Sequence, residues 1–187
     1  MPKRARSSSS LTGGTGDVNP QWLNLFSTNN PGTSYTEGGF PIPIQRLPDS
    51  GKAQVMEILK VEWGLGAQVN VMAVTAAAWF SAYLTTRSFG TTEPTGALQN
   101  GTVISKWNIN YYFGSGVGVT ALLETPKIND LTDGAGHGIL VATDNIYLGY
   151  IASAAAEPIA GTFTCRVLFR WKNVSLAEYI GIVQSQQ

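Results

Sequence analysis

The feature of this sequence that most constrains its fold is a series of about eight or nine strand-like segments. Each segment is apolar or alternates apolar and polar residues, and clusters of Gly, Pro, Asn and Asp separate it from the next. No long amphipathic helix interrupts the series, which excludes repeated βαβ units and leaves a sandwich, a barrel or a jelly roll. The segments are 54–63, 68–76, 79–89, 103–111, 117–124, 138–143, 146–152 and 162–171.

The segment 54–63 also has the composition of a helix, because Met, Glu, Leu and Lys are good helix formers. A strand is favoured because most of its large apolar residues then share one face. Those residues are Val55, Leu59, Val61 and Trp63, and Glu57 is the exception. In the segment 103–111, Lys106, Asn108 and Asn110 alternate with residues of the opposite face, as in a half-buried antiparallel strand.

Two stretches near the ends of the chain have other patterns. Five prolines make residues 17–50 an extended, non-helical segment, in which 40–44 could form an edge strand with the missing amides facing outward. Residues 175–183 fit either a last strand or a helix, because Ser175 and Glu178 have the spacing of a capping box.

The charge content of the chain is low. Charged residues make up 13% of it, against roughly 25% in typical soluble domains. Gly, Thr, Ser and Asn replace them and give a weakly charged surface that suits extensive protein–protein contact. A low-charge secreted β-domain has the same composition. The 12 basic and 12 acidic residues balance, which argues against a uniformly basic nucleic-acid binder but allows one with a local basic region.

One basic region is the N-terminal arm. Residues 1–16 carry Lys3, Arg4 and Arg6, contain no acid, and are rich in Ser and Gly. A disordered cationic segment of this kind binds phosphate backbones without reading sequence, by releasing counterions. A solubilising tail is the alternative interpretation.

A second basic set lies in the segment 162–172. Arg166, Arg170 and Lys172 fall on one face of the expected strand, and apolar residues fall on the other. The apolar face belongs in the core. The basic face could form salt bridges with acidic neighbours or line a surface that binds nucleic acid, and the sequence pattern favours neither. The tryptophans could stack on bases. Anchoring of the core or of subunit contacts is their more usual role, and Trp22 is the candidate for an interface.

Groups that could support catalysis or hold a metal are sparse. The single histidine, His137, lies in a glycine-rich loop without the nucleophile and orienting acid of a triad. Asp130 and Asp133 precede it, and a polar turn explains the three residues better than an ion site does. Cys165 is expected to be a buried thiol. The sequence predicts a non-enzymatic protein without cofactor, metal, signal peptide or transmembrane helix.

Four stretches resemble the capsid proteins of small circular Rep-encoding single-stranded DNA viruses (CRESS-DNA viruses), in particular their unclassified environmental members. Three of these stretches lie in the first third of the chain, and the middle of the chain is less distinctive. The stretches are GGTGDVNPQ at 13–21, PIQRLP at 43–48, QVMEILKV at 54–61 and FRWKNVSLAEYIGIVQ at 169–184.

The resemblance implies an all-β fold, a single antiparallel jelly roll of about eight strands with a disordered or extended N-terminal arm. It implies about sixty copies in a T=1 icosahedral shell around circular single-stranded DNA, in a virion whose assembly could take place in the host cell nucleus. It places a basic arm inside the shell. Circovirus-like capsid proteins usually have a long arginine-rich arm, whereas this arm has three basic residues. Interior strand residues or small cations would then supply the remaining charge. The predicted parts are the arm at 1–16, the extended segment at 17–50 and the jelly-roll domain at 51–187.

The resulting hypothesis is a self-assembling capsid subunit that binds nucleic acid without sequence specificity and has no membrane partner. A coat protein of a small RNA virus or satellite virus is the alternative in the same class, because a basic arm does not distinguish DNA from RNA. A carbohydrate-binding β-sandwich, with exposed tryptophans stacked on sugars, is the alternative in another class. The residues predicted to contact nucleic acid are Lys3, Arg4, Arg6, Arg166, Arg170 and Lys172.

Overall fold

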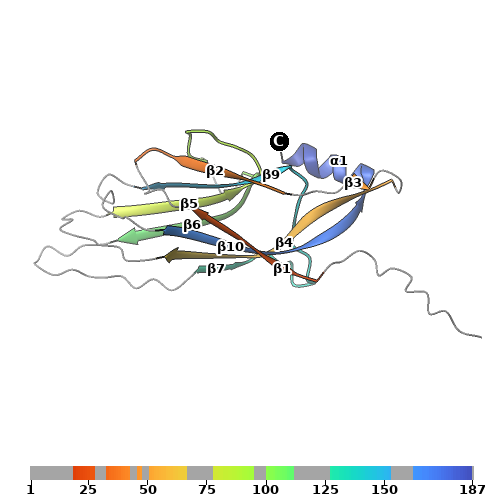
Figure 1. The fold of residues 1–187 in the computed structure, drawn as a ribbon, viewed down its shortest axis with the longest axis horizontal. Helices are drawn as coiled ribbons and strands as arrows, with labels where there is room; N and C mark the ends of the chain where they lie inside the picture. The colour runs from red at the N-terminus through yellow and green to blue at the C-terminus, as the bar shows by residue number, and fades with distance from the viewer. Residues whose placement is uncertain are drawn as a thin grey trace, which may run out of the picture.

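Two antiparallel β-sheets face each other in the computed structural model of the protein (Figure 1). The structure describes residues 19–27, 33–42, 46–47, 51–66, 78–94, 100–111, 127–152 and 162–186. The first sheet has the order β1 (Gln21–Ser27), β10 (Thr162–Ser175), β4 (Lys52–Gly66). Along the other side of β4 lie, one after another, β3 (Arg46–Leu47), β8 (Ile139–Val141) and β7 (Lys127–Asp130). The second sheet has the order β2 (Thr36–Pro41), β9 (Asn145–Ala152), β5 (Ala78–Thr85), β6 (Val103–Tyr111).

The chain changes sheet at most of its connections. It passes from β1 in the first sheet to β2 in the second, returns to β4, and crosses again to β5 and its neighbour β6. It then returns to β7 and β8, crosses to β9 and ends in β10. With β7 and β8 taken as two pieces of one edge strand, and β3 set aside, the described residues form four principal strands in each sheet. This order is the predicted jelly roll.

Several sequence predictions are confirmed strand by strand. The segments 103–111, 146–152 and 162–171 correspond to β6, β9 and β10. The range 40–44 could form an edge strand, and this is met only in part: β2 is an edge strand of the second sheet, but it covers Thr36–Pro41, and residues 43–44 lie outside the described residues. Other predictions fall outside the described residues, namely the basic arm at 1–16 and the strands at 68–76 and 117–124.

The strand predicted at 79–89 is wrong beyond Thr85, where β5 ends. The residues that follow leave the sheet and are held by Glu37 of β2. The Glu37 carboxylate accepts hydrogen bonds from the backbone N–H groups of Phe89 and Gly90, both at 3.0 Å. A carboxylate from β2, which is separated from β5 by β9, thus holds the residues that would have continued β5.

The core between the sheets is centred on two tryptophans. Trp63 of β4 and Trp107 of β6 are buried and stacked, with ring centroids 6.4 Å apart. Trp63 Nε1 donates to Ser105 Oγ at 2.9 Å, so an indole of one sheet is anchored to the other. Cys165 is buried as predicted, and its burial raises the pKa of the thiol. Other core residues include Leu25, Ile58, Val61, Phe80, Leu84, Ile146, Leu148 and Val167.

A β-bulge in β4 changes which residues face the core. β4 and β10 pair along their whole length, but their register shifts at Leu59, which is an extra residue on β4. Before the bulge Met56 and Ile58 face the core, and after it Val61 and Trp63 do. A strand without the bulge would turn one half of this apolar set toward solvent, because side chains alternate strictly between the two faces.

The bulge corrects one prediction from the sequence. Strict alternation placed Val55 on the same face as Val61 and Trp63, with Glu57 as a polar exception. In the structure Val55 and Glu57 lie on the outer face of the first sheet. Val55 packs there in a small apolar cluster beneath the C-terminal helix, and Glu57 accepts hydrogen bonds from neighbouring segments.

The C-terminal helix α1 (Leu176–Ser185) lies beside the ends of β4 and β10 that are near β3 (Figure 1). Ser175 Oγ accepts a hydrogen bond from the N–H of Glu178 at 3.2 Å, so the helical alternative for this segment is confirmed. Among the described residues no helix is long and apolar enough to cross a membrane, and α1 has 10 residues. Its inner side chains Tyr179, Ile182 and Val183 pack on Ala53, Val55, Ala142 and Val174.

We expect deletion of Leu59 to prevent folding, because it removes the bulge and turns half of the apolar residues of β4 outward. Leu59→Ala keeps the register and is the matched control, with an expected loss of about 2–3 kcal/mol in the free energy of unfolding. Far-UV circular dichroism and urea unfolding measure both. A deletion variant with wild-type spectrum and midpoint would contradict the role given to the bulge.

Candidate nucleic-acid interface

The three basic residues predicted on the strand 162–172 lie on the outer face of the first sheet. Arg166, Arg170 and Lys172 extend from β10 away from the core, whereas Cys165 and Val167 on the opposite face are fully buried. The alternation of β10 therefore follows the sequence pattern.

Acidic residues of β4 stand directly opposite two of these cations. Arg166 is in register with Glu62, and Arg170 with Glu57. Arg166 Nε donates to Glu62 Oε2 at 3.1 Å, and Arg170 Nε donates to Glu57 Oε2 at 2.5 Å. Since opposed residues on one face of an antiparallel pair lie within side-chain contact, the register of β4 and β10 produces both ion pairs.

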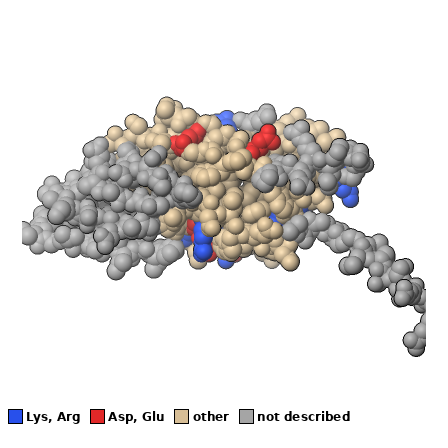
Figure 2. Space-filling model, in the orientation of Figure 1, with Lys and Arg blue, Asp and Glu red and all other residues tan. Residues whose placement is uncertain are grey.

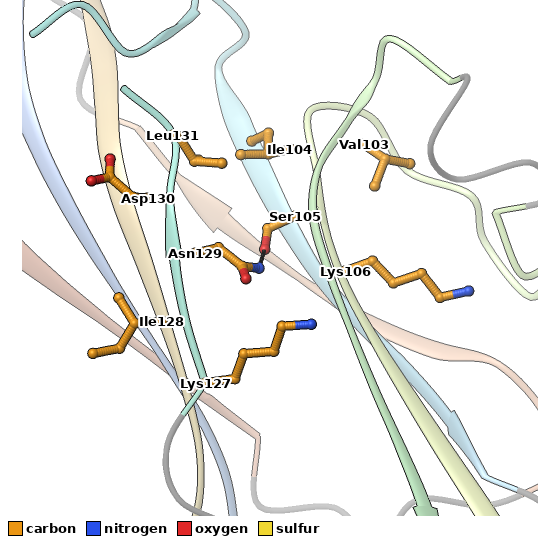
Figure 3. A pocket seen from close by; sticks show the side chains of 9 residues that line it. All are labelled: Val103, Ile104, Ser105, Lys106, Lys127, Ile128, Asn129, Asp130 and Leu131. Atoms are coloured by element: carbon orange, nitrogen blue, oxygen red, sulfur yellow. Dashed lines mark hydrogen bonds between the residues drawn. The ribbon is translucent and has the colours of Figure 1, made fainter. Parts of the chain in front are cut away.

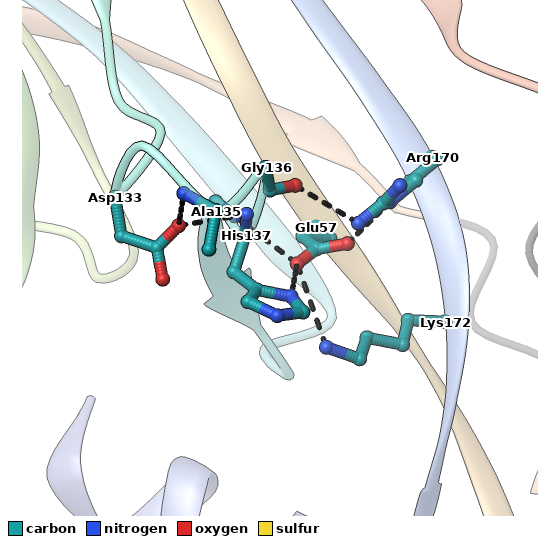
Figure 4. A network of polar contacts seen from close by, with 8 residues as sticks. Glu57, Asp133, Ala135, Gly136, His137, Arg170 and Lys172 are labelled. Atoms are coloured by element: carbon teal, nitrogen blue, oxygen red, sulfur yellow. Dashed lines mark hydrogen bonds and ion pairs between the residues drawn. The ribbon is translucent and has the colours of Figure 1, made fainter.

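Glu57 is the centre of a larger polar cluster (Figure 4). Its side chain is fully buried, and Oε1 accepts from the N–H of Gly138 at 3.1 Å. Lys172 Nζ lies 3.5 Å and His137 Nδ1 lies 3.9 Å from the same oxygen. Burial alone would raise the pKa of this carboxyl and is the largest single effect. The hydrogen bonds from Arg170 and Gly138 and the charge of Lys172 together outweigh it and lower the pKa.

The connection between β7 and β8 is fastened to this cluster. Arg170 Nη2 donates to the carbonyl oxygen of Gly136 at 3.1 Å. One oxygen of Asp133 accepts from the backbone N–H groups of Ala135 and His137, at 2.9 and 3.0 Å. The cluster thus joins β4, β10 and this connection on the outer face of the sheet.

The residues considered as an ion site are used within their own turns. Asp130 accepts from the backbone N–H and the hydroxyl of Thr132, at 3.0 and 2.8 Å, and Asp133 accepts from its own turn. In the part of the chain that the structure describes, no group of three or more His, Cys, Asp or Glu side chains could hold a metal ion. The geometry therefore favours the polar-turn interpretation of Asp130, Asp133 and His137.

The cations of β10 are largely engaged by the fold itself. Three positive side chains meet the two carboxylates of Glu57 and Glu62, which leaves one positive charge in excess. Arg166 is 56% exposed, whereas Arg170 and Lys172 are 22% and 28% exposed. The geometry is that of the salt-bridged surface, one of the two alternatives open from the sequence. Contact of these three residues with nucleic acid stays a prediction.

The acidic partners were not identified as site residues from the sequence. Glu57 and Glu62 lie more than a hundred residues before their partners, and only the strand register brings them together. The available signal was Glu57 itself, a carboxylate in an otherwise apolar strand pattern. Of the other predicted contacts, Lys3, Arg4 and Arg6 lie outside the described residues.

An exposed aromatic ring lies beside this surface. Trp22 of β1 is 43% exposed, and the guanidinium carbon of Arg166 lies 4.9 Å from the centroid of its ring. This distance is that of a cation–π contact. The five tryptophans thus divide: Trp63 and Trp107 form the core, Trp171 is half-buried, and Trp22 and Trp79 are exposed.

A cleft of about 520 Å³ lies between the edge strands β6 and β7 (Figure 3). Asn129 Nδ2 donates to Ser105 Oγ at 2.6 Å across the gap between the two sheets. Lys106 also lines the cleft, but its ammonium group lies 4.8 Å from the centroid of the Tyr83 ring. The polar groups in the cleft therefore include the Asn129 amide, the Ser105 hydroxyl and the exposed ammonium of Lys127. Its described lining contains no nucleophile–base pair.

Solved structures match this chain at the level of the fold. VP1 of Trichodysplasia spinulosa-associated polyomavirus, in complex with sialylated precision glycooligomers, has a TM-score of 0.55 and 9% identity over 88% of this chain and 97% of the VP1 chain. The same VP1 with GM1 oligosaccharide has a TM-score of 0.53 and 9% identity over 83% of this chain and 95% of the VP1 chain. Merkel cell polyomavirus VP1 with GD1a oligosaccharide has a TM-score of 0.50 and 8% identity over 88% of this chain and 98% of the VP1 chain. No family model and no curated protein matches the sequence. The shared property is the jelly-roll fold.

We expect Glu57→Gln to lower the free energy of unfolding at pH 7 by about 3 kcal/mol, because it leaves the half-buried cations Arg170 and Lys172 without their buried carboxylate. The folded pKa of Glu57 is lowered, so its stabilisation is complete above the ordinary Glu pKa and is lost as the pH falls through the folded value. The difference between wild type and variant should therefore shrink in acid. Urea unfolding from pH 7 down to pH 3 measures it.

Glu62→Gln is the matched control, since its partner Arg166 is more exposed to solvent. Exposed ion pairs contribute at most about 1 kcal/mol, so this loss should be smaller. Equal losses in the two variants, or a Glu57→Gln loss that does not change with pH, would contradict the central role of Glu57.

Proposed function

We propose that this chain is a capsid subunit that assembles with copies of itself into a small icosahedral shell around a circular single-stranded DNA genome. The observation that carries the proposal is the strand order of the two sheets, a jelly roll of the kind seen in the VP1 structures. Because one fold can serve many functions, the proposal also needs support from the surface and from the charges.

The surface of the subunit suits repeated protein–protein contact. Charged side chains appear as small, separate patches on the face seen in Figure 2. Exposed large apolar residues occur on the first sheet, on the second sheet and on the helix. They are Trp22, Trp79, Ile128, Leu176 and Ile180. Low charge with exposed aromatic and aliphatic residues is the composition of interface centres.

The arm is the proposed site of genome contact. On the sheet, Arg166 and Arg170 face carboxylates, which limits their use for phosphate. Lys3, Arg4 and Arg6 lie in a segment with no acid. Three charges bind weakly, but about sixty arms directed into one interior act together through their high local concentration. A basic arm would bind RNA in the same way, so the coat protein of a small RNA or satellite virus is the alternative. In either case the protein is located in the virion.

A carbohydrate-binding sandwich is the second candidate function. Trp22 favours it, because an exposed indole beside a guanidinium could stack on a sugar ring and bind an acidic group. The VP1 neighbours were solved with sialylated or ganglioside-type oligosaccharides. A monomer whose tryptophan fluorescence changes with such oligosaccharides, and whose Trp22→Ala variant shows no change, would favour this function over the capsid proposal.

Removal of residues 1–16 tests the arm. We expect the truncated chain to fold and assemble but to package less nucleic acid, seen as a lower ratio of absorbance at 260 and 280 nm in purified particles. A full-length variant with Lys3→Ala, Arg4→Ala and Arg6→Ala separates loss of charge from loss of length. Unchanged packaging in both would exclude the arm as the genome contact.

Expression of the chain alone tests the proposal as a whole. We expect uniform closed particles in negative-stain microscopy, and the absorbance ratio of the same fraction reports enclosed nucleic acid. A monomer at every salt concentration and pH tested would contradict the capsid function.

A further inference from the structure

Strand β1 forms one edge of the first sheet. Among the described residues it pairs with β10 alone, and no other described backbone hydrogen bond reaches it. The pairing with β10 is regular over all seven residues, from Gln21 opposite Phe169 to Ser27 opposite Phe163. A strand at the edge of a sheet presents a row of backbone N–H and C=O groups on its outer side. The outer side of β1 therefore offers donors and acceptors to another strand.

This edge carries none of the features that usually prevent edge-to-edge pairing. Proteins block such edges with charged side chains, proline, bulges or short strands. The sequence of β1, QWLNLFS, contains no charged residue and no proline, and its register with β10 has no bulge. The other described edge strands of four or more residues each carry a charge, namely Glu37 in β2, Lys106 in β6, and Lys127 and Asp130 in β7. Among the described edges, β1 is thus the one suited to receive a strand from outside.

The sequence of β1 indicates which strand this is. Read outward from its centre at Asn24, QWLNLFS is nearly a palindrome: both directions give leucine, then an aromatic residue, then a polar residue. A two-fold axis at Asn24 sets each half of one antiparallel strand opposite the other half of its copy. Each residue then lies opposite one of its own kind, and aromatic pairs are among the cross-strand pairs that stabilise sheets. The strand that complements β1 is therefore β1 itself.

We propose that β1 pairs, edge to edge and antiparallel, with β1 of a second copy of this chain across a two-fold axis at Asn24. The first sheets of two subunits then form one continuous sheet. Backbone hydrogen bonds supply the attraction and the alternating side chains set the register, as in other cases of strand addition. The inference goes beyond the proposed function, because the contact can form in a free dimer as well as in a shell.

The surroundings of β1 are compatible with this contact. Asn24 is exposed on the outer face, so its amide can hydrogen-bond with Asn24 of the second copy. On the opposite face Leu23 is half-buried at the margin of the core, where a second strand would cover it further. Arg166 lies opposite Asn24 in β10 and is paired with Glu62. The joined sheets therefore bring no unpaired like charges together at the axis.

The first test places charges at the axis. Asn24→Lys and Asn24→Asp each set two like charges directly opposite one another, which destabilises cross-strand pairing. We expect each variant alone to need a subunit concentration roughly fivefold higher or more to associate, and an equimolar mixture of the two to associate like wild type. Asn24→Gln is the neutral control. Sedimentation velocity of the full chain measures association, and circular dichroism verifies that each variant is folded.

The recovery in the mixture is specific to pairing of residue 24 with itself. Damage within the subunit from either substitution would persist when the variants are mixed. Association of both single variants at the wild-type concentration, or a mixture that associates no better than its components, would overturn the proposal.

The second test uses Asn24→Cys to locate the axis. Directly opposed residues of antiparallel strands have Cβ atoms about 4.5–5.5 Å apart, which a small adjustment brings within disulfide range. We expect a covalent dimer with oxidised glutathione, seen on a non-reducing gel. Gln21→Cys is the matched control, because its two thiols would lie roughly 20 Å apart. Cys165 is buried and present in both variants. No dimer from Asn24→Cys, or equal amounts from both variants, would overturn the proposal.

Failure of the proposed function is distinguishable from failure of this inference. Shells that form equally well from wild type, Asn24→Lys and Asn24→Asp would leave the capsid function intact and reject the β1 contact. Wild-type dimers that form no shells, but whose association follows the charges at residue 24, would reject the shell and uphold the contact. A wild type that sediments as a monomer at every concentration would reject both.

Discussion

The pairing of β4 with β10 is the constraint on which the rest of the structure depends. The two strands pair from Lys52 and Ser175 at one end to Gly66 and Thr162 at the other. The opposite side of β4 is divided among three short strands, so β4 joins early, middle and late parts of the chain in one sheet. The bulge at Leu59 then determines which residues of β4 enter the core, and the same register sets Glu57 and Glu62 opposite two arginines.

The all-β class could be predicted from the sequence because it depends on patterns that are local, whereas the choice of a jelly roll over a sandwich or a barrel came from the resemblance to capsid proteins. Alternation and turn residues identified β6, β9 and β10, and the spacing of Ser175 and Glu178 left the helix open as an alternative. The bulge could not be predicted, because an extra residue on one strand is defined by its partner strand. The end of β5 depends in the same way on Glu37, which lies on a strand far away in the sequence.

The candidate site likewise could be predicted only as far as it depends on a single strand. The sequence placed Arg166, Arg170 and Lys172 on one outward face, which needs only the alternation of a single strand. Whether these cations are available depends on the opposite strand, and there the register supplies carboxylates. A basic face that looks suited to phosphate in one strand is close to neutral in the sheet. This shifts the proposed genome contact toward the arm, where Lys3, Arg4 and Arg6 have no acid in the same segment.

Two departures from ordinary folding rules differ in how they are compensated. Glu57 is a buried carboxylate, and its cost is offset inside the subunit by Arg170, Lys172 and the amide of Gly138. Gly181 in α1 lowers the stability of the helix relative to alanine, and no contact with a described neighbour offsets this cost. The packing of the described residues therefore explains the first departure and does not explain the second.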